Sequence, residues 1–305
     1  MKYKQKQQLK QSLHQELNKV KTSLPMPGVA DQVAQEVFVQ QILDSIRRVD
    51  FVYTQRQRNI SAVCAAPTSD AFDPIKAAIY YFANNQIEEA FWLVFLSTFT
   101  GKHKSKKWIM LSEMYSMLGT GQLLTWDYIN NNFQQFSSWY EKNHPNITRA
   151  FGNHRKFETL KAHADGSPIN VFSSYIHWVG GNHQEMISDA IVKIGPDPKD
   201  LFDYLFNAMS AVKQFGRTSR FDYLTMLGKV GLAHIEPPNI YLQGSTGPLG
   251  GAKLLFGTGF TKQEYEGKIT ELGDALTLGP MSMQVLEDSL CNWQKSPRVY
   301  KLFIG

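Results

Sequence analysis

The sequence predicts an all-α protein, built mainly from helices with few or no strands. Apolar residues recur at spacings of three and four along most of the chain, and few segments alternate in the way that strands do. A hydrophobic fraction of 43% over 305 residues supports an ample core, in one large domain or two smaller ones. No internal repeat or low-complexity tract interrupts this pattern.

The first predicted element is a basic amphipathic helix in residues 1–24. Leu9, Leu13, Leu17 and Val20 follow at spacings of 4, 4 and 3, as on one face of a helix. Turn residues at 25–28 end it, so that 25–305 form the main helical domain, either single or divided into two helical lobes. This segment supplies the whole net charge of +5, because Glu16 alone opposes Lys2, Lys4, Lys6, Lys10, Lys19 and Lys21.

The remaining helices are predicted from apolar spacing and start signals. Asp73 followed by Pro74 indicates an N-cap and a first helical residue. Two short pieces, 51–53 and 240–242, are candidates for extended chain. In the second helix, the residues expected to point inward are Val33, Val37, Ile42 and Ile46. Helices are predicted near 31–49, 75–84, 86–100, 107–118, 132–143, 153–163, 168–179, 183–194, 198–214, 219–230, 262–276 and 281–294.

The composition limits the class of protein. No apolar run reaches the roughly 18 residues of a membrane span, and the longest, 90–99, suits a buried helix. The first residues carry charges without an apolar stretch, so no signal peptide is expected. With only Cys64 and Cys291, the chain is expected in a reducing compartment, the cytoplasm, and cannot form a cysteine-only zinc site.

A second basic stretch follows the long apolar helix. Its residues are Lys102, His103, Lys104, Lys106 and Lys107. Together with the N-terminal lysines, this stretch suits a polyanion held through its phosphates. Each stretch by itself is more typical of a solvated loop or helix end.

The most informative segment is 283–297, MQVLEDSLCNWQKSP, which concentrates polar residues in a helix-like run. It places the adjacent carboxylates of Glu287 and Asp288 in a helix, and Cys291, Asn292, Trp293 and Lys295 follow. A buried carboxylate is costly unless it is paired or used in chemistry, which favours a functional site here. The alternative is an ordinary last helix whose core face is Met283, Leu286, Leu290 and Trp293.

Two other segments concentrate polar groups. In FGNHRKF (151–157), a helix start beside basic residues would bind an anion, unless it is simply a capped surface helix. In QFGRTSRFDYL (214–224), Arg217 and Arg220 can hold a phosphate or fix a carboxylate. Asp222 lies between two aromatic residues and is either paired with one of these arginines or reactive.

A glycine-rich turn in 241–256, YLQGSTGPLGGAKLLF, runs into an apolar helix. Its backbone amides could face a phosphate, assisted by the helix dipole. It has neither a Walker ending nor the dinucleotide spacing. In order, a helix at 220–230, this turn and a helix at 251–257 follow the logic of a helix–hairpin–helix element, although the connection is longer than usual.

Several stretches of the sequence resemble one known family. They are QQILDSIRRVDFV (40–52), FDPIKAAI (72–79), IEEAFWLVFL (87–96), FGNHRKF (151–157), GRTSRFDYLTMLGKVGL (216–232), QGSTGPLGGAKLLFG (243–257) and MQVLEDSLCNWQKSP (283–297). On these blocks the chain, from residue 25 onward, is similar to the alpha-glutamyl/putrescinyl-thymine pyrophosphorylase group, clade 3. That group resembles DNA glycosylases of the helix–hairpin–helix superfamily in fold.

The resemblance implies an enzyme that acts on modified bases in phage DNA. The family is named for proposed roles in building hypermodified thymine. The clade is also similar to Brig-type antiphage DNA glycosylases, which remove alpha-glucosyl-hydroxymethylcytosine and leave abasic sites. We therefore expect first a defence glycosylase that flips out and excises such a base. The alternative is a transferase that joins an amine or amino acid to activated hydroxymethyluracil, and the third hypothesis is a non-catalytic DNA-binding protein.

The site residues follow from what base excision requires, namely a carboxylate near the anomeric carbon, grips on phosphates and a pocket for the flipped base. The candidate carboxylates are Glu287, Asp288, Asp222 and Asp274. Asp274 is included because the resemblance implies a catalytic Asp some way past the hairpin, in the region that holds Asp274 near the end of its helix. The candidates for binding DNA phosphates are Arg217, Arg220, Gly244, Ser245, Thr246, Gly247, Gly250, Lys253, Arg155 and Lys156. The candidates for the base or sugar pocket are Asn153, His154, Tyr223, Tyr241, Gln243, Asn292, Trp293 and Lys295.

No cofactor is expected. Two cysteines cannot supply a four-cysteine iron–sulfur cluster, and the histidines lack zinc-ligand spacing. No lysine stands out as a nucleophile among Lys229, Lys253 and Lys295, which favours a monofunctional enzyme. The expected partner is double-stranded phage DNA containing modified bases, bound by a monomer and without a membrane.

Overall fold

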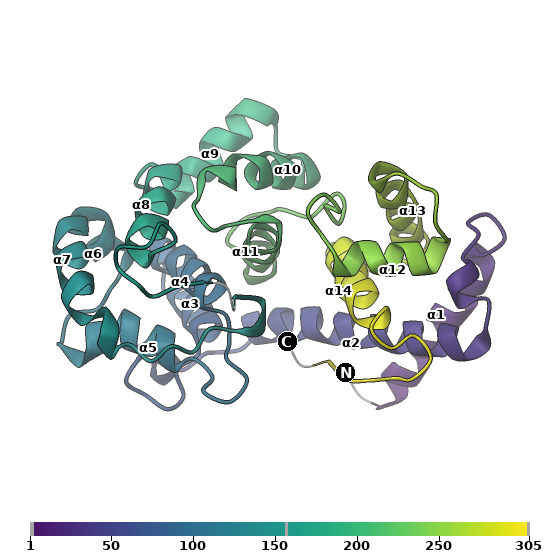
Figure 1. The fold of residues 1–305 in the computed structure, drawn as a ribbon, viewed down its shortest axis with the longest axis horizontal. Coiled ribbons are helices and arrows are strands. Elements are labelled where there is room, and N and C mark those ends of the chain that lie inside the picture. Colours follow the sequence, from purple (N-terminus) through teal and green to yellow (C-terminus); the bar gives the residue numbers. More distant parts are fainter. Residues whose placement is uncertain (1–2, 156–157, 304–305) are drawn as a thin grey trace. The chain divides into compact units, whose positions relative to one another are not determined.

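The computed structural model consists of helices joined by loops in the residues that it describes, 3–155 and 158–303 (Figure 1). No strand occurs in these ranges, so the predicted all-α class is confirmed. The chain divides into two compact units, residues 3–52 with 236–303, and residues 53–235. No helix of the described residues is long and apolar enough to cross a membrane.

The first unit joins the two ends of the chain. Its helices are α1 (Tyr3–Val20), η1 (Pro27–Val29), most of α2 (Gln32–Arg56), α12 (Gly247–Phe256), α13 (Lys262–Ala275) and α14 (Ser282–Trp293). The core contains Phe38 and Trp293, whose ring centres lie 5.0 Å apart. Gly251 lets α12 pack closely on α14, because a Cβ at this position would collide with the carbonyl of Leu290.

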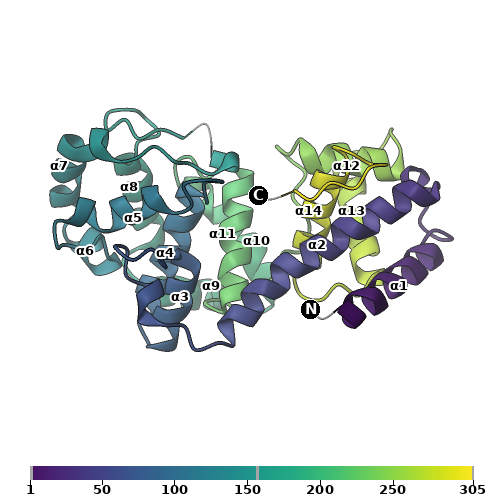
Figure 2. The same cartoon turned by 90° about the horizontal axis from the view of Figure 1, so that it is seen from below.

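The basic N-terminal helix packs on the rest of this unit. Figure 2 shows α1 alongside the first half of α2, and its predicted apolar stripe is buried at Leu13 and Leu17. Lys10 pairs with Glu36 of α2, and Lys21 donates to the carbonyl of Val29 at 2.6 Å. Several lysines that give this segment its charge are therefore used inside the protein. Lys2 lies outside the described residues.

Two predictions for α2 need correction. The chain at 51–53 is helical, because no glycine or proline interrupts residues 32–56 and the helix continues to Arg56. Of the residues predicted to point inward, Val37 and Ile42 are buried and Ile46 is half-buried, whereas Val33 is 53% exposed at the start of the helix. The other suggested extended piece, 240–242, is a loop with no strand partner among the described residues.

The second unit surrounds one buried helix. Its elements are η2 (Ala62–Cys64), α3 (Pro74–Ala83), α4 (Ile87–Thr100), α5 (Ile109–Tyr115), η3 (Met117–Gly119), α6 (Trp126–Asn131), α7 (Phe133–Asn143), η4 (His144–Asn146), η5 (Asn153–Arg155), α8 (Pro168–Val179), α9 (His183–Ile194), α10 (Pro198–Ala208), η6 (Met209–Ala211) and α11 (Arg217–Val230). Every residue of α4 from Glu89 to Thr100 is buried, as expected for a helix that is apolar on all sides. The predicted cap is confirmed, since Asp73 accepts from the amides of Ile75 and Lys76.

The helix predicted at 153–163 is wrong. Only η5 forms, and the described residues from Glu158 to His163 are not helical. Carbonyls that a helix would have used accept side-chain donors instead: Arg149 donates to Glu158 and Tyr140 donates to Leu160. Conversely, α6 was not predicted, because six residues are too short to show a period.

Candidate functional site

The carboxylates predicted on the last helix lie in the first unit. The alternative reading of α14 is correct for its apolar face, since Met283, Leu286, Leu290 and Trp293 are all buried. Glu287 and Asp288 lie off this face and are half-buried. The segment therefore combines a core face with two carboxylates that remain partly accessible.

Asp288 is held by two side chains of α2. Its Oδ2 accepts from the Ser45 hydroxyl at 3.1 Å and from Arg48 Nε at 3.3 Å. The side chains of Asp288 and Arg48 are 34% and 38% exposed, so the ion pair is reachable from solvent. The Nη2 atom of Arg48 is buried and has no hydrogen-bond partner among the described residues. The sequence did not point to Ser45 or Arg48, because they precede Asp288 by 243 and 240 residues along the chain.

The C-terminal segment lies on the same helix. Tyr300 donates to Asp44 at 2.6 Å, and Gln41 donates to the carbonyl of Lys301 at 2.9 Å. Burial and the nearby Asp44 carboxylate raise the pKa of Tyr300 to about 12. Gln41, Ser45 and Arg48 recur at spacings of 4 and 3, which puts them on one face of α2. The spacing of these three polar residues on one face of α2, together with their burial, is the signal that could have revealed the partners of Asp288.

The glycine-rich turn precedes α12 in the same unit. Helix α12 starts at Gly247 with Pro248 next and has no side-chain cap. Gly244 adopts a left-handed conformation with φ of 78°, and Ser245 Oγ donates to the carbonyl of Leu242. Thr246 and Lys253 are exposed, and Gly250 lies next to Gln294, the C-cap residue of α14. A Cβ on Gly247 would lie 2.6 Å from Cys291 Sγ, so this glycine also serves close helix packing.

The proposed helix–hairpin–helix element is divided between the two units. Helix α11 ends at Val230 in the second unit, and α12 begins at Gly247 in the first. The connection between the two helices, residues 231–246, is longer than the usual compact hairpin, as the sequence indicated, and the helix–hairpin–helix element stays a prediction.

Other predicted residues of the first unit have varied surroundings. Trp293 is fully buried, and its indole N–H donates to the carbonyl of Pro297 at 3.2 Å. Stacking on a base would require this ring to leave the core. Asn292 accepts from Lys295 at 3.1 Å, and Gln243 accepts from Lys262 at 3.0 Å. Tyr241 is half-buried, and Asp274 is exposed near the end of α13.

The predicted residues of the second unit are mostly committed to its own structure. Arg155 is 6% exposed, donates to the carbonyl of Thr98 at 2.7 Å and pairs with Asp222 at 2.9 Å. Asp222 is thus paired, but with an arginine other than the two suggested. Asn153 and His154 are exposed on η5, whereas Lys156 lies outside the described residues.

The two arginines at the start of α11 lie against aromatic rings. Arg217 is placed over Phe221, with its guanidinium 5.0 Å from the ring centre. Arg220 stacks on Phe206 at 4.4 Å and donates to the carbonyl of that residue. Tyr223 is fully buried in the core, where its hydroxyl lies 2.8 Å from that of Tyr175.

A polar pocket that the sequence did not reveal opens at the start of α4. It has a volume of about 520 Å³ and is lined by Tyr81, Asn85, Gln86, Ile87, Glu88, Glu89, Thr125, Trp126, Asp127, Asn130, Gly181 and Gln184. Three of these residues are acidic and none is Lys or Arg. Its volume falls in the range of small-molecule sites.

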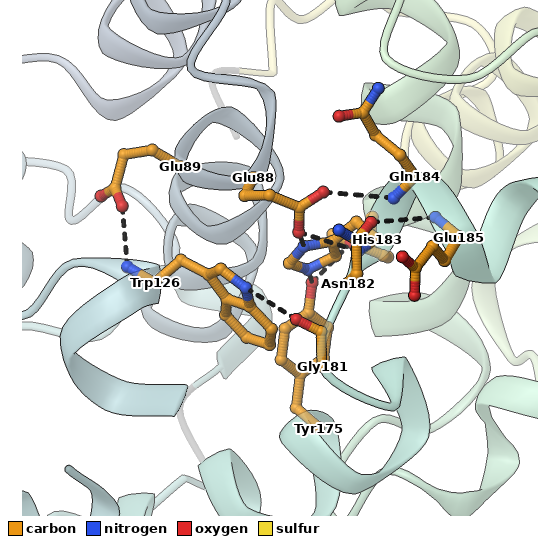
Figure 3. Close-up of polar contacts among 10 residues, drawn as sticks. Glu88, Glu89, Trp126, Tyr175, Gly181, Asn182, His183, Gln184 and Glu185 are labelled. Atoms are coloured by element: carbon orange, nitrogen blue, oxygen red, sulfur yellow. Dashed lines mark hydrogen bonds and ion pairs between the residues drawn. The ribbon is translucent and has the colours of Figure 1, made fainter. Parts of the chain in front are cut away.

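Two adjacent carboxylates of this pocket have different partners (Figure 3). Glu88 accepts from the backbone N–H groups of His183 at 2.8 Å and Gln184 at 3.2 Å. Glu89 accepts from the backbone N–H of Trp126 at 2.7 Å. It also accepts from the Tyr115 hydroxyl. Each carboxylate therefore satisfies the open amides at the start of a neighbouring helix, α9 or α6.

A buried hydrogen-bonded chain extends from Glu88 into the core (Figure 3). His183 Nδ1 lies 2.6 Å from Glu88, and its Nε2 lies 2.7 Å from the Tyr175 hydroxyl. Burial lowers the pKa of His183, so the ring is neutral at pH 7. Because a carboxylate only accepts, Nδ1 carries the hydrogen, and Nε2 accepts from Tyr175. Tyr175 in turn accepts from Tyr223.

The pKa values of the two carboxylates move in opposite directions. Burial alone would raise the pKa of Glu88, but the hydrogen bonds from His183 and Gln184 hold it below its usual value. Burial raises the pKa of Glu89 to about 7, despite its bonds from Tyr115 and Trp126, and the charge of Asp127 adds to the rise. Glu89 can therefore take up or release a proton near neutral pH, which is the property of a general acid or base.

Metal binding has no support in the described residues. No group of three or more His, Cys, Asp or Glu side chains there is arranged to hold an ion. Cys64 and Cys291 are both half-buried, and neither is in a disulfide.

Comparison with known proteins gives one match. No curated protein and no solved structure matches the chain. Residues 33–305, which include all of α2 to α14 except the first residue of α2, match the family described as alpha-glutamyl/putrescinyl thymine pyrophosphorylase clade 3. The match covers far more than half of the chain, and the chain belongs to this family.

Proposed function

We propose that this chain is an enzyme of DNA-base hypermodification, which joins an amine or an amino acid to an activated hydroxymethyluracil in DNA. The family match over residues 33–305 carries the proposal, because the family name describes a pyrophosphorylase and a thymine with a glutamyl or putrescinyl group. The match favours this transferase over the excision of a glucosylated cytosine, which we expected first from the resemblance to Brig-type glycosylases.

The proposed reaction is a substitution at the carbon attached to C5 of the pyrimidine. The amine nitrogen forms a bond to this methylene carbon, and the C–O bond to pyrophosphate breaks. Pyrophosphate leaves with the electron pair, and the nitrogen gives up a proton to a base. No oxidant or reductant is needed. The enzyme must expose the pyrimidine, stabilise the departing charge and accept the proton.

We assign the reacting carboxylate to α14, with Asp288 ahead of Glu287. Asp288 is partly exposed and is fixed by Ser45 and Arg48, so its position is defined and it remains accessible. A fixed carboxylate can orient an attacking amine or accept its proton. Asp274 has no such fixing partner among the described residues. Asp222 is also fixed by an arginine, Arg155, and is 44% exposed, but it lies on α11 and not on the helix whose polar pattern the sequence singled out.

The phosphates are assigned to the start of α12 and to Lys253. The uncapped N-terminus of this ten-residue helix offers backbone N–H groups, and Lys253 is exposed on the same helix. Arg217 and Arg220 lie against aromatic rings in the second unit, which makes them weaker candidates for the same role.

Glu89 is the rival to Asp288. Its pKa of about 7 is better matched to accepting a proton at neutral pH than that of an ordinary carboxylate. It also lines a pocket of about 520 Å³, large enough for a small amine. The variants Asp288→Asn and Glu89→Gln separate the two assignments.

The test is a measurement of pyrophosphate release. The full chain is incubated with duplex DNA carrying diphosphorylated hydroxymethyluracil, with putrescine or glutamate as amine. The proposal expects release that requires both the modified DNA and an amine. The same incubation is repeated with DNA that carries glucosylated hydroxymethylcytosine. If the enzyme excises bases, a free base and an abasic site appear on either DNA. Binding without either product on these DNAs would contradict both enzymatic hypotheses and leave a DNA-binding protein.

A further inference from the structure

Two basic segments, far apart in sequence, meet in the second unit. Helix α4 ends at Thr100, and the carbonyl of Thr100 accepts the N–H of Gly152 at 2.9 Å. A Cβ on Gly152 would lie 3.0 Å from the backbone of Gly101 and Lys102, so the two segments are in contact at these glycines. The basic stretch 102–107 therefore starts where residues 152–155 cross it.

Arg155 anchors residues 152–155 to the core of the second unit. Its guanidinium is buried and bonds to the carbonyl of Thr98 and to Asp222. With Arg155 turned inward, Asn153 and His154 are left exposed on η5, beside the crossing. The arginine thus holds the surface in place and does not form part of it.

The basic stretch is an ordered turn. His103 and Lys107 exchange two backbone hydrogen bonds, at 3.0 and 2.9 Å. His103 Nδ1 accepts the backbone N–H of Lys106 at 3.0 Å and that of Ser105 at 3.3 Å. Because the backbone is already fixed, a ligand that binds here has little chain entropy left to remove.

The turn presents unpaired positive charge. Lys104, Lys106 and Lys107 are exposed, and their ammonium groups have no partner among the described residues. The sequence has no Asp or Glu in 101–112 or in 142–157. At the start of the stretch, the carboxylate of Asp73 lies 4.0 Å from Lys102. By contrast, Lys10 and Lys19 of α1, and Lys21 just after it, bond to groups within the first unit.

We propose that the turn surface, formed by residues 102–107 with Asn153 and His154, grips the backbone phosphates of duplex DNA. Lysines give sequence-independent contacts, and the side chains of Asn153 and His154 add hydrogen-bond donors. The choice of duplex DNA as the polyanion rests on the proposed function. The surface itself rests on the ordered turn and its unpaired lysines.

The test compares two triple variants of the full chain. One is Lys104→Gln/Lys106→Gln/Lys107→Gln. The other is Lys193→Gln/Lys199→Gln/Lys213→Gln, which removes the same charge from exposed lysines of the same unit. Binding to a short fluorescent duplex is measured over a series of salt concentrations. The turn variant should reduce the slope of log affinity against log salt by roughly 2 to 3, since each phosphate contact adds about 0.9. The control should keep the wild-type slope.

Equal slopes for wild type and turn variant would overturn the proposal, and so would equal losses in both variants. Tighter turn-dependent binding to an RNA duplex of the same length would overturn the choice of DNA. The outcome is independent of the chemistry. Turn-dependent binding without base modification would refute the proposed function alone, whereas modification with an unchanged slope would refute this surface alone.

Discussion

Glu88 and Glu89 are neighbours on α4, yet each caps a different helix. Glu88 accepts the first amides of α9, and Glu89 accepts the first amide of α6. Both lie in the first turn of α4, so three helix starts meet around this pair. The pair therefore ties together elements of the second unit and also forms the acidic lining of the pocket.

The first prediction concerns Glu88. In Glu88→Gln, one of the two accepting oxygens becomes an NH₂ group. The side chain can then no longer accept from both His183 and Gln184, so the variant should lose about 2 kcal/mol of unfolding free energy. Urea denaturation measures the loss. Glu185→Gln, at an exposed carboxylate in the first turn of α9, should change stability by less than about 0.5 kcal/mol. Equal effects of the two substitutions would refute the capping role.

The second prediction concerns the pH dependence from Glu89. Its folded pKa is raised to about 7 from an ordinary value of 4.5, so the folded state holds this proton more tightly than the unfolded state. The contribution of this carboxyl group to the stability of the folded state is fully present below pH 4.5, and it is lost as the pH rises through about 7. The span corresponds to roughly 3 kcal/mol.

Glu89→Gln should remove this part of the pH dependence. The difference in unfolding free energy between variant and wild type should move in favour of the variant between pH 4.5 and 7.5. Thermal or urea unfolding at several pH values measures it. A difference that stays constant with pH would show that the carboxyl has an ordinary pKa in the folded protein.

The third prediction concerns two helical glycines of the first unit. An added Cβ at Gly251 collides with the backbone of Leu290, so Gly251→Ala should destabilise the protein by about 1–3 kcal/mol through separation of α12 from α14. At Gly267 of α13 nothing lies within 4 Å of the new atom, and Gly267→Ala should stabilise by about 0.5–1 kcal/mol. The same sign of change at both positions would contradict the packing.

The fourth prediction concerns Asp288. Asp288→Asn should lower the rate of base modification at least about 100-fold, because a neutral amide can neither accept a proton nor stabilise positive charge. Unfolding free energy is measured alongside, to show that the variant folds. Asp189→Asn, at an exposed position of α9, should keep the wild-type rate. A normal rate in Asp288→Asn with a dead Glu89→Gln would move the chemistry to the second unit.

Local patterns in the sequence were enough to predict most helices. The spacing of apolar residues placed α8, α9, α13 and α14 to within a residue or two, and Asp73–Pro74 fixed the start of α3. The failures share a cause. At 51–53 local preference for extended chain was overruled by an uninterrupted helix, and at 158–163 side chains from Tyr140 and Arg149 took the carbonyls that a helix needs.

The site was less predictable, because its partners are distant in sequence. Glu287 and Asp288 were recognisable as adjacent carboxylates in the last helix, but Ser45 and Arg48 were not recognisable as the partners of Asp288. The pair at Glu88 and Glu89 looked like ordinary acidic residues at a helix start. The hydrogen bonds that give this pair its role come from His183 and Trp126, which lie far from it in sequence and near it only in the folded protein.

The central claim is tested most directly by the intact mass of the DNA strand. The full chain is incubated with an oligonucleotide duplex carrying diphosphorylated hydroxymethyluracil and with putrescine, and the strand is weighed before and after. The account predicts an unbroken strand in which the diphosphate has been replaced by the amine. A strand that has lost its base, or one of unchanged mass, would contradict it.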